Sequence, residues 1–295
     1  MGAKSLIRHL IEASGFTIQR LPSSPPHPDS GAPTDEAVIV PPPEEEATQD
    51  STDAVAEGFP DAYDEDGLRS FHNHDFMQDP DFRRAYERGC QAAHDYGWHW
   101  RVHIGLWAAF SASKLNGDFV ECGVNRGFLS SAIMAHLNWD ALGKTFYLLD
   151  TFEGIDPLYC SEADIKAGAI EKNNKALADG FYVKNVDSVR ENFSEWHNIS
   201  IIEGSIPETL DQVKADQIAF LHIDMNCSPP EIAALTYFWD RLVPGAIILL
   251  DDYAYIGFEP QKQAMDAFAR QHNLQIASLP TGQGLLLRPP TISQG

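Results

Sequence analysis

The sequence predicts an α/β fold, with a doubly wound and mostly parallel sheet of seven strands. Beyond Gly117, apolar runs of strand length alternate with segments of helical spacing, which implies parallel strands joined by right-handed crossovers. The runs are continuously apolar, as in parallel strands buried on both faces. The chain then ends with two strand-like runs joined by PTGQG at 280–284. This short connection predicts that the last strand is antiparallel.

The strand-like runs and the segments between them give the expected order of elements. Strands are expected at 119–124, 145–150, 199–203, 218–224, 246–251, 274–279 and 285–288. Helices are expected at about 129–137, 162–178, 186–195, 206–213, 229–241 and 259–272. In such a sheet, ligands bind beyond the carboxyl ends of the strands. The residues that follow the first five strands are therefore the candidates for function.

Two helices are expected before the first strand. Asp79 and Pro80 are typical of the N-cap and first residue of a helix, and Phe82 and Tyr86 continue it at helical spacing. The second helix covers about 98–114, and its aromatic residues are more typical of a core than of a ligand site. These helices begin a domain that is expected to span 67–295.

Residues 1–66 differ in composition from the rest of the chain. Residues 1–20 contain an amphipathic segment at 4–20, which predicts weak contact with a membrane surface or docking on a partner. A helix that packs against the domain, or a frayed end of the chain, is the alternative. Residues 21–66 are acidic and rich in proline, with PPPEEE at 41–46. Few bulky apolar residues occur there, so burial cannot offset the entropy of ordering. We therefore expect a disordered linker.

Charge and cysteine content exclude some classes of protein. The formal net charge is −22, and an acidic surface repels the phosphates of nucleic acids. The four cysteines form no CxxC pair, as expected of free thiols in a reducing cytoplasm. No apolar run reaches the ~20 residues that span a bilayer, and the N-terminus lacks the pattern of a signal peptide. We therefore expect a cytoplasmic protein that does not bind nucleic acid.

A glycine turn follows the first expected strand. The sequence ECGVNRG at 121–127 runs from this strand into a helix opened by Ser130. Gly123 and Gly127 would let the backbone approach a ligand closely, and Glu121 can bind a cationic amino group or ribose hydroxyls. The dinucleotide fingerprint GxGxxG is absent. A tight turn without a ligand is the alternative interpretation.

Polar residues also follow the second and third strands. Asp150 ends the second strand within LLDTFEG, about twenty residues beyond the glycine turn. An acid at this place is the usual partner of ribose hydroxyls, so it indicates an adenosine group without fixing the reaction. Glu203, Gly204 and Ser205 follow the third strand and would line the adenine. An ordinary turn in which Ser205 caps the next helix is the alternative.

Three carboxylates mark the ends of the fourth and fifth strands. Asp224 ends AFLHID, and Asp251 and Asp252 come at the end of AIILLDD. These carboxylates should converge at one edge of the sheet, where like charges are costly unless a cation binds them. Oxygen ligands favour Mg²⁺, Ca²⁺ or Mn²⁺ over zinc. The sequence therefore predicts a divalent-cation site, with helix capping and solvated strand ends as the alternative.

Together, ECGVNRG, LLDTFEG, LHID and LLDDY resemble the macrocin O-methyltransferase (TylF/MycF-type) family in their order and spacing. The resemblance covers roughly residues 70–290. It implies a Rossmann-like class I methyltransferase fold. It also implies transfer of a methyl group from S-adenosylmethionine to a sugar hydroxyl of a natural product, with the help of Mg²⁺ or another divalent cation. The acceptor would be a small molecule or a glycan.

The resemblance also implies roles for individual residues. It places the cofactor on Glu121, Gly123, Asn125, Gly127, Asp150, Thr151, Phe152, Glu203, Gly204 and Ser205. It places the cation on Asp224, Asp251 and Asp252, and it makes Asp224 the candidate base. Sheets of this kind often belong to homo-oligomers, so self-association is also expected.

One residue departs from the pattern of the family. Family members commonly carry Asp-x-Asp after the fourth strand, whereas this chain has Asp224-Met225-Asn226. Asn226 offers a carbonyl oxygen but cannot act as a base, and His103 or His222 could substitute if either lies nearby. Two other classes therefore stay open. One is a non-catalytic module that binds S-adenosylmethionine; the other is an NAD(P)-dependent sugar oxidoreductase, disfavoured because GxGxxG and a Tyr-x-x-x-Lys pair are absent.

Overall fold

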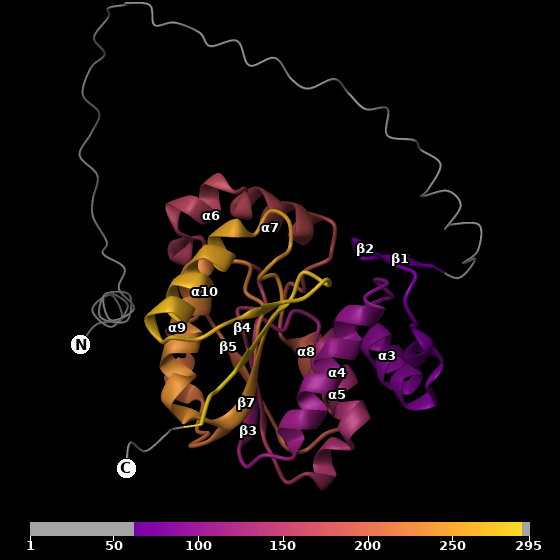
Figure 1. Ribbon diagram of the computed structural model, residues 1–295. Helices are drawn as coiled ribbons and strands as arrows, with labels where there is room; N and C mark the ends of the chain where they lie inside the picture. Colours follow the sequence, from indigo (N-terminus) through magenta and orange to yellow (C-terminus); the bar gives the residue numbers. More distant parts are fainter. Residues whose placement is uncertain (1–61, 291–295) are drawn as a thin grey trace, which may run out of the picture.

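A sheet of seven strands runs through the structure and is covered by helices on both faces (Figure 1). The computed structural model describes residues 62–290. The strands of this sheet are β3 (Asp118–Cys122), β4 (Phe146–Asp150), β5 (Ile199–Glu203), β6 (Ile218–Ile223), β7 (Leu242–Leu250), β8 (Ala277–Ser278) and β9 (Gly284–Leu287). They lie in the order β5-β4-β3-β6-β7-β9-β8.

The pairing of the strands confirms the mostly parallel sheet. β3 to β7 are parallel to their neighbours within that group, whereas β9 is antiparallel to both β7 and β8. The order of the strands reverses between β3 and β6. In open α/β sheets, ligands bind beyond the carboxyl ends of the strands at this reversal, so the ends of β3 and β6 mark the expected site.

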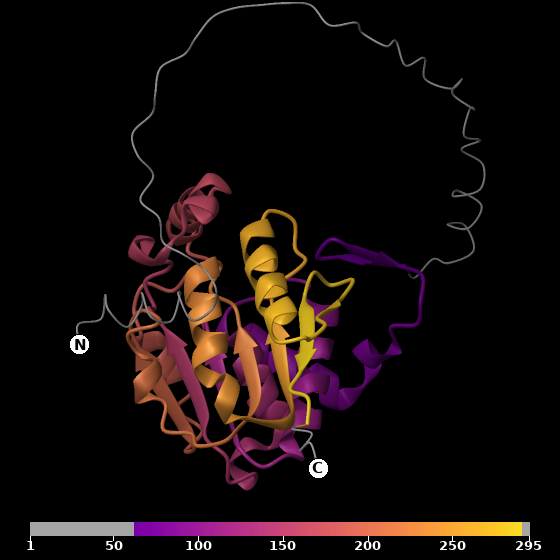
Figure 2. The same cartoon turned by 60° about the vertical axis from the view of Figure 1, so that its left-hand side comes forward.

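The helices fall into two groups, one on each side of the sheet (Figures 1 and 2). One side holds α3 (Pro80–Ala92), α4 (His99–Ser113), α5 (Phe128–Leu137) and α8 (Asp187–Asn192), and the other holds α9 (Ser228–Phe238) and α10 (Glu259–Gln271). Successive side chains of a strand point to opposite faces of the sheet. Phe119 therefore packs into the core on the α3 side of the sheet, and Val120 packs into the core on the α9 side. Both are fully buried, which explains the continuously apolar runs.

Shorter elements complete the fold. Between β4 and β5, the chain forms α6 (Glu162–Lys166) and α7 (Ala169–Ala178), which lie beyond one end of the strands (Figure 1). The 3-10 turns are η1 (Asp75–Gln78), η2 (Trp139–Ala141), η3 (Pro157–Tyr159), η4 (Leu210–Gln212) and η5 (Trp239–Arg241). At the start of α3, the side chain of Asp79 accepts the backbone N–H of Asp81 at 2.7 Å and that of Phe82 at 3.3 Å. The predicted N-cap is therefore confirmed.

Two local predictions were wrong. The segment 206–213 does not form a regular helix, and only η4 forms there within the described residues. Ile206, Leu210 and Val213 are nevertheless buried, so an irregular turn buries the same apolar side chains that suggested a helix. Ser130 does not open α5. The residue before this helix is a glycine in the left-handed conformation, and Ser130 is buried in the first turn.

The ordered domain begins before the boundary expected at residue 67. β1 (Tyr63–Glu65) and β2 (Leu68–Ser70) form an antiparallel hairpin, and Figure 2 shows it beside the loops at one edge of the sheet. Tyr63 is buried, and its hydroxyl donates to a backbone oxygen at 3.0 Å. The last residues of the expected linker, 62–66, therefore belong to the fold. The rest of that linker and the segment 4–20 lie outside the described residues.

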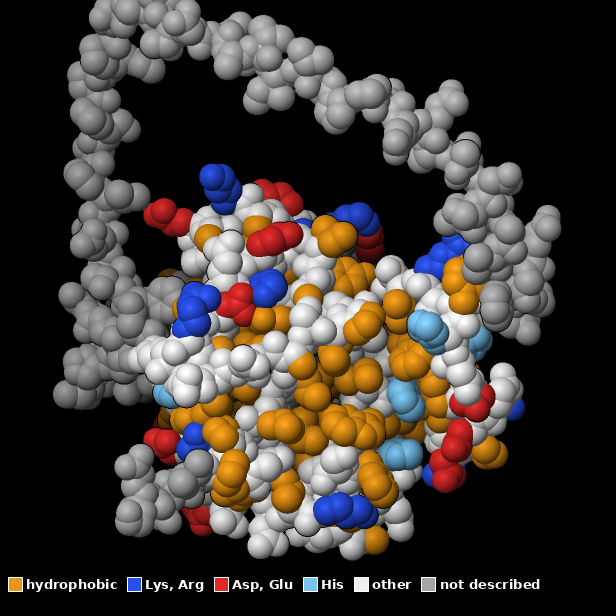
Figure 3. Space-filling view, viewed as in Figure 1, with side chains coloured by type: hydrophobic (Ala, Val, Ile, Leu, Met, Phe, Trp, Pro, Cys, Tyr) orange, Lys and Arg blue, Asp and Glu red, His pale blue; other side chains and the backbone are white. Residues whose placement is uncertain are grey.

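The surface over α4 is apolar, as Figure 3 shows. Trp107 and Phe110 on this helix are 50% and 48% exposed, and Leu287 on β9 is 53% exposed. Self-association of the chain stays a prediction.

Among residues 62–290, no helix combines the length and the apolar character needed to cross a membrane.

Candidate functional site

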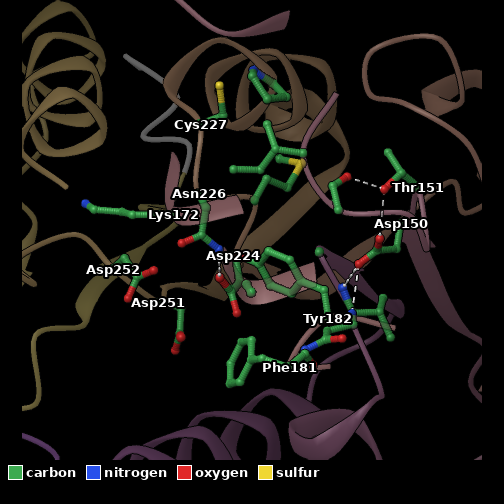
Figure 4. Close-up of a pocket in the computed structure, with 18 of the residues that line it drawn as sticks. Asp150, Thr151, Lys172, Phe181, Tyr182, Asp224, Asn226, Cys227, Asp251 and Asp252 are labelled. Carbon is green, nitrogen blue, oxygen red and sulfur yellow. Dashed lines mark hydrogen bonds between the residues drawn. The ribbon is translucent and has the colours of Figure 1, made fainter. Parts of the chain in front are cut away.

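A cavity of about 380 Å³ lies at the carboxyl ends of β3, β4, β6 and β7 (Figure 4). This volume lies within the range of small-molecule sites. Two groups of polar residues face the cavity, one after β3 and β4 and the other after β6 and β7. Aromatic side chains form much of the remaining wall: Tyr96, Trp98, Phe181, Tyr182, Tyr255 and Phe258.

The first polar group centres on Asp150 at the end of β4. Its Oδ2 accepts the backbone N–H groups of Val124 at 2.6 Å and Asn125 at 2.8 Å. Its Oδ1 accepts the backbone N–H of Phe152 at 2.7 Å. Asp150 thus joins the glycine turn after β3 to the end of β4. Thr151 Oγ1 also lies 3.3 Å from Asp150 Oδ1, but its single proton can instead go to the backbone oxygen of Gly154 at 2.5 Å. A carboxylate offers about four lone-pair sites, so Asp150 Oδ1 can then also accept a hydroxyl group of a ligand in the cavity.

Gly123 is required because two strand ends meet at this residue. Its φ is +90°, and a Cβ there would lie 1.7 Å from the backbone oxygen of Asp224. A side chain of any kind would force the two strand ends apart. The glycine turn after β3 therefore packs directly against the residue that follows β6. This contact sets the separation between the two polar groups of the cavity.

Glu121 on β3 and His222 on β6 form a buried pair in the cavity wall. Glu121 Oε1 lies 2.9 Å from His222 Nδ1, and His222 Nε2 lies 3.6 Å from Asp251 Oδ1. Burial lowers the pKa of His222, but the carboxylates of Asp251 and Glu121 outweigh burial and raise that pKa to about 10. The imidazole lies between two carboxylates, which favour its charged form.

One carboxylate oxygen of this pair lacks a partner. Glu121 is 3% exposed and lines the cavity, and its Oε2 makes no hydrogen bond within residues 62–290. A buried polar atom without a partner is costly, and such atoms are rare in folded proteins. The oxygen therefore fits a donor that a ligand supplies. A cationic amino group is the donor best suited to a carboxylate in this position.

The second polar group consists of Asp224, after β6, and Asp251 and Asp252, after β7. One oxygen from each carboxylate lies within 4.8 Å of the others, and Figure 4 shows the three side chains close together. Burial and the charges of Asp251 and Asp252 raise the pKa of Asp224 well above its usual value. Burial and Asp251 likewise raise the pKa of Asp252 to about 6. These oxygen donors fit a hard divalent cation such as Mg²⁺, which would relieve the repulsion.

The cluster also contains a cation that no sequence motif indicated. Arg101 on α4 donates from Nη1 to the side chain of Asp251, and the same nitrogen lies 3.4 Å from Asp252 Oδ1. Its Nε donates to Asp66 Oδ2 at 3.2 Å. Burial alone would raise the pKa of Asp251, but Arg101 and His222 lower it overall. Arg101 and Asp251 are 150 residues apart in the chain, so no spacing pattern could have linked them.

Comparison with known proteins gives the family. The macrocin O-methyltransferase (TylF) family matches residues 106–279, which is more than half of the chain. The chain belongs to this family.

Two curated relatives come from Streptomyces. Demethyldecarbamoylnovobiocin O-methyltransferase of Streptomyces niveus is 26% identical over 171 residues, which cover 55% of this chain and 62% of that protein. The 8-demethyl-8-(2,3-dimethoxy-alpha-L-rhamnosyl)-tetracenomycin-C 4'-O-methyltransferase of Streptomyces olivaceus is 26% identical over 152 residues, which cover 48% of this chain and 55% of that protein. The chain therefore spans less than two thirds of the length of these relatives.

Solved structures confirm the fold of this TylF-family chain. The O-methyltransferase NovP has a TM-score of 0.55 at 20% identity, covering 64% of this chain and 79% of its own. The calicheamicin methyltransferase CalS11 has a TM-score of 0.51 at 14% identity, covering 73% of this chain and 94% of its own. The predicted class I methyltransferase fold, with its antiparallel last strand, is therefore confirmed.

The structure brings most of the residues expected at the cofactor site to the cavity wall. Those that line it are Glu121, Gly123, Asn125, Asp150, Thr151, Gly204 and Ser205. Three others lie outside the cavity wall. Phe152 is fully buried in the core, and Glu203 is exposed and ion-paired with Arg190 at 3.3 Å. Gly127 precedes α5 with a φ of +81°, and it packs against an aromatic ring outside the cavity wall.

Two of the wall residues use their side chains within the protein. Asn125 Nδ2 donates to the backbone oxygen of Phe181 at 3.1 Å, and Asn125 Oδ1 accepts the backbone N–H of Val183 at 2.9 Å. Ser205 Oγ donates to Asp156 Oδ2 at 2.6 Å and caps no helix. Asn125 and Ser205 therefore shape the wall, and a ligand would meet mainly their backbone atoms.

The structure also separates the two candidate histidines. His103 stacks on Phe76, with 4.0 Å between ring centroids, and it does not line the cavity. His222 lines the cavity beside the acidic cluster. Asn226 Nδ2 donates to Asp224 Oδ1 at 3.1 Å. Asn226, which stands where the family commonly has aspartate, therefore contacts Asp224 through its amide nitrogen.

Proposed function

We propose that this chain is an S-adenosylmethionine-dependent O-methyltransferase that acts on a sugar hydroxyl of a secondary metabolite, with a divalent cation at the acidic cluster. A single observation carries the proposal: one cavity joins Asp150, the candidate partner of an adenosine group, to three partly buried carboxylates. Membership of the TylF family supports the reaction. The Streptomyces olivaceus relative supports the acceptor, because its name includes a rhamnosyl group and a 4'-O-methyltransferase activity.

Asp150 and Glu121 would bind the two polar ends of the methyl donor. S-adenosylmethionine supplies the methyl group, whose carbon bonds to the acceptor oxygen as its bond to sulfur breaks. Asp150 would accept a ribose hydroxyl, as acids at the end of the second strand do in nucleoside sites. Glu121 Oε2, which is buried without a partner in the described part of the chain, would accept the amino group.

Asp224 is the candidate for the proton of the acceptor hydroxyl. Its carboxylate lies in the cavity wall, where it would accept that proton as a general base. A divalent cation held by Asp224, Asp251 and Asp252 would lower the pKa of that hydroxyl and orient it. Binding both substrates in one cavity would supply most of the rate enhancement through proximity.

The wall around the acidic cluster suits a sugar ring. Trp98, Tyr182 and Tyr255 line it, and their flat apolar faces can cover the C–H faces of a pyranose while their polar atoms meet its hydroxyls.

Lys172 on α7 donates to the backbone oxygen of Gly257 at 2.6 Å. This hydrogen bond links α7 to the segment before α10, both of which line the cavity.

The test combines binding with turnover. Titration calorimetry with S-adenosylhomocysteine measures the donor site, and mass spectrometry after incubation with S-adenosylmethionine and a panel of deoxysugar-bearing acceptors detects the methylated product. Binding and a product that is lost on chelation of divalent cations are the expected results. Binding of NADH without S-adenosylhomocysteine would contradict the proposal. Binding of S-adenosylhomocysteine without methylation of any acceptor would favour a non-catalytic module, which Asn226 at the family's usual aspartate also suggests.

A further inference from the structure

Two buried charged residues reach the acidic cluster from outside the matched part of the chain. Asp66 lies in the turn between β1 and β2, and Arg101 lies in α4; both precede residues 106–279. Their side chains are 10% and 9% exposed. Removing charges from water is costly unless good partners compensate. The burial of this pair at the cavity wall therefore points to a role in the site.

Several contacts fix the direction in which the guanidinium points. Its Nε donates to Asp66 Oδ2 at 3.2 Å, and its Cζ lies 5.0 Å from the ring centroid of Tyr255. The hydroxyl of Tyr255 in turn donates to Asp66 Oδ1 at 3.3 Å. The guanidinium of Arg101 is planar and rigid, so these contacts direct its Nη1 toward Asp251 and Asp252.

We infer that Arg101 is a resident cation of the acidic cluster that competes with a divalent cation for Asp251 and Asp252, and that Asp66, which holds the guanidinium in place, moderates this competition by sharing its charge. The inference rests on the cation site of the proposed function. The carboxylates that would ligate a divalent cation are the ones that Nη1 contacts, so the two positive charges repel each other at short range. Arg101 therefore lowers the affinity of the cluster for a divalent cation.

Asp66 acts in the opposite direction. Its carboxylate attracts the Nε of Arg101 and shares the positive charge that would otherwise act on Asp251 and Asp252 alone. It also adds a negative charge near the cluster, and it lines the cavity. Loss of Asp66 should therefore weaken cation binding, and most of this effect should disappear when Arg101 is absent. Asp66 is a positioning residue, because it acts on the cation site through Arg101.

Calorimetric titration of Mn²⁺ into the full-length chain tests the inference without measuring activity. Arg101→Gln should tighten Mn²⁺ binding about tenfold, because a positive charge next to the ion is removed. Arg101→Lys keeps the charge and should stay within about threefold of the unmodified chain. Asp66→Asn should weaken Mn²⁺ binding by about threefold to tenfold.

A matched control lies on the same hairpin. Asp64 pairs with Arg69 at 3.7 Å, and both side chains are more than half exposed, so Asp64→Asn should leave Mn²⁺ affinity unchanged. The double variant Asp66→Asn/Arg101→Gln tests the positioning role. Asp66→Asn should have a smaller effect in that background than in the unmodified chain, since the pair is coupled.

The outcomes separate this inference from the proposed function. Unchanged or weaker Mn²⁺ binding in Arg101→Gln would overturn the inference, as would Mn²⁺ binding to none of the variants. If Arg101→Gln fails to fold by circular dichroism, Asp66→Asn decides, and Mn²⁺ affinity equal to that of Asp64→Asn would overturn the inference. S-adenosylhomocysteine is titrated into the same samples. Its failure to bind the unmodified chain would refute the proposed reaction, whereas the comparison of Mn²⁺ affinities would still decide the role of Arg101.

Discussion

The two polar groups of the cavity are stabilised in different ways. The first group, here called the donor side because it would bind the methyl donor, centres on Asp150, which accepts backbone N–H groups from turns that adjoin β3 and β4. The second group, here called the acidic side, consists of Asp224, Asp251 and Asp252. The charge of Asp251 is compensated there by the side chains of Arg101 and His222, which come from α4 and β6. Backbone donors are present whatever the side chain, whereas charge compensation depends on each residue. Changes in the compensating charges should therefore alter the acidic side and leave the donor side unchanged.

The largest effect is expected for Asp224→Asn, which removes the candidate base and one cation ligand. The turnover number should fall by about 10²–10⁴-fold, the usual contribution of a general base, while S-adenosylhomocysteine affinity stays nearly unchanged. Initial rates and calorimetry measure the two quantities. The exposed Asp211 provides the control variant Asp211→Asn. Full turnover in Asp224→Asn would show that the acidic side takes no part in the reaction.

Gly123→Ala tests the contact that holds the two sides together. The added Cβ would clash with the backbone oxygen of Asp224, so the free energy of unfolding should fall by about 3 kcal/mol or more. Gly143 also has a positive φ, but a Cβ added there would meet no atom within 4 Å, so Gly143→Ala should cost only about 1 kcal/mol. Urea unfolding measures both variants. Equal losses would mean that the close approach of the two strand ends contributes little.

Asp150→Asn should impair the donor side alone. The NH2 group of asparagine would replace one carboxylate oxygen and would face backbone N–H groups that this oxygen now accepts. S-adenosylhomocysteine affinity should therefore fall by about tenfold to a hundredfold. Mn²⁺ affinity should not change, because Asp150 is not among the residues of the acidic cluster. Asp187, whose side chain is 87% exposed, provides the control Asp187→Asn. A parallel loss of Mn²⁺ binding would break the distinction between the two sides.

The smallest effect is expected for Asn226→Asp, which restores the usual pattern of the family. A carboxylate beside Asp224 should tighten Mn²⁺ binding by about threefold to tenfold. The same change replaces a hydrogen-bond donor with a like charge, so the melting temperature without divalent cation should fall. Calorimetry and thermal unfolding with and without Mn²⁺ measure these shifts. Weaker Mn²⁺ binding would indicate that residue 226 lies too far from the cation to contribute.

The sequence predicted what depends on short stretches of chain. The apolar runs predicted the strands because burial on both faces leaves no polar positions, and the carboxyl ends of those strands placed Asp150 and Asp224 at one edge. The positions of the Phe152 and Glu203 side chains could not be predicted in this way, because the direction of each depends on how the turn leaves its strand. The fold of 206–213 could not be predicted either, because this segment buries the expected side chains without forming a helix.

The compensating charges were also beyond prediction. Arg101 lies within an apolar and aromatic helix that suggested a core, and Asp66 lies at the end of a segment whose composition predicted disorder. Their contact with Asp251 and Asp252 depends on the packing of α4 and of the β1–β2 hairpin against the sheet edge. Close carboxylates predicted a need for positive charge, and the protein itself supplies part of that charge through Arg101.

Titration of S-adenosylhomocysteine in the presence of a chelator, followed by the same titration with Mg²⁺, tests the central claim most directly. The donor side is held by backbone hydrogen bonds and should bind with a dissociation constant of about micromolar order in both conditions. Absence of binding in both conditions would contradict the methyltransferase assignment. Binding that appears only with Mg²⁺ would contradict the independence of the two sides of the cavity.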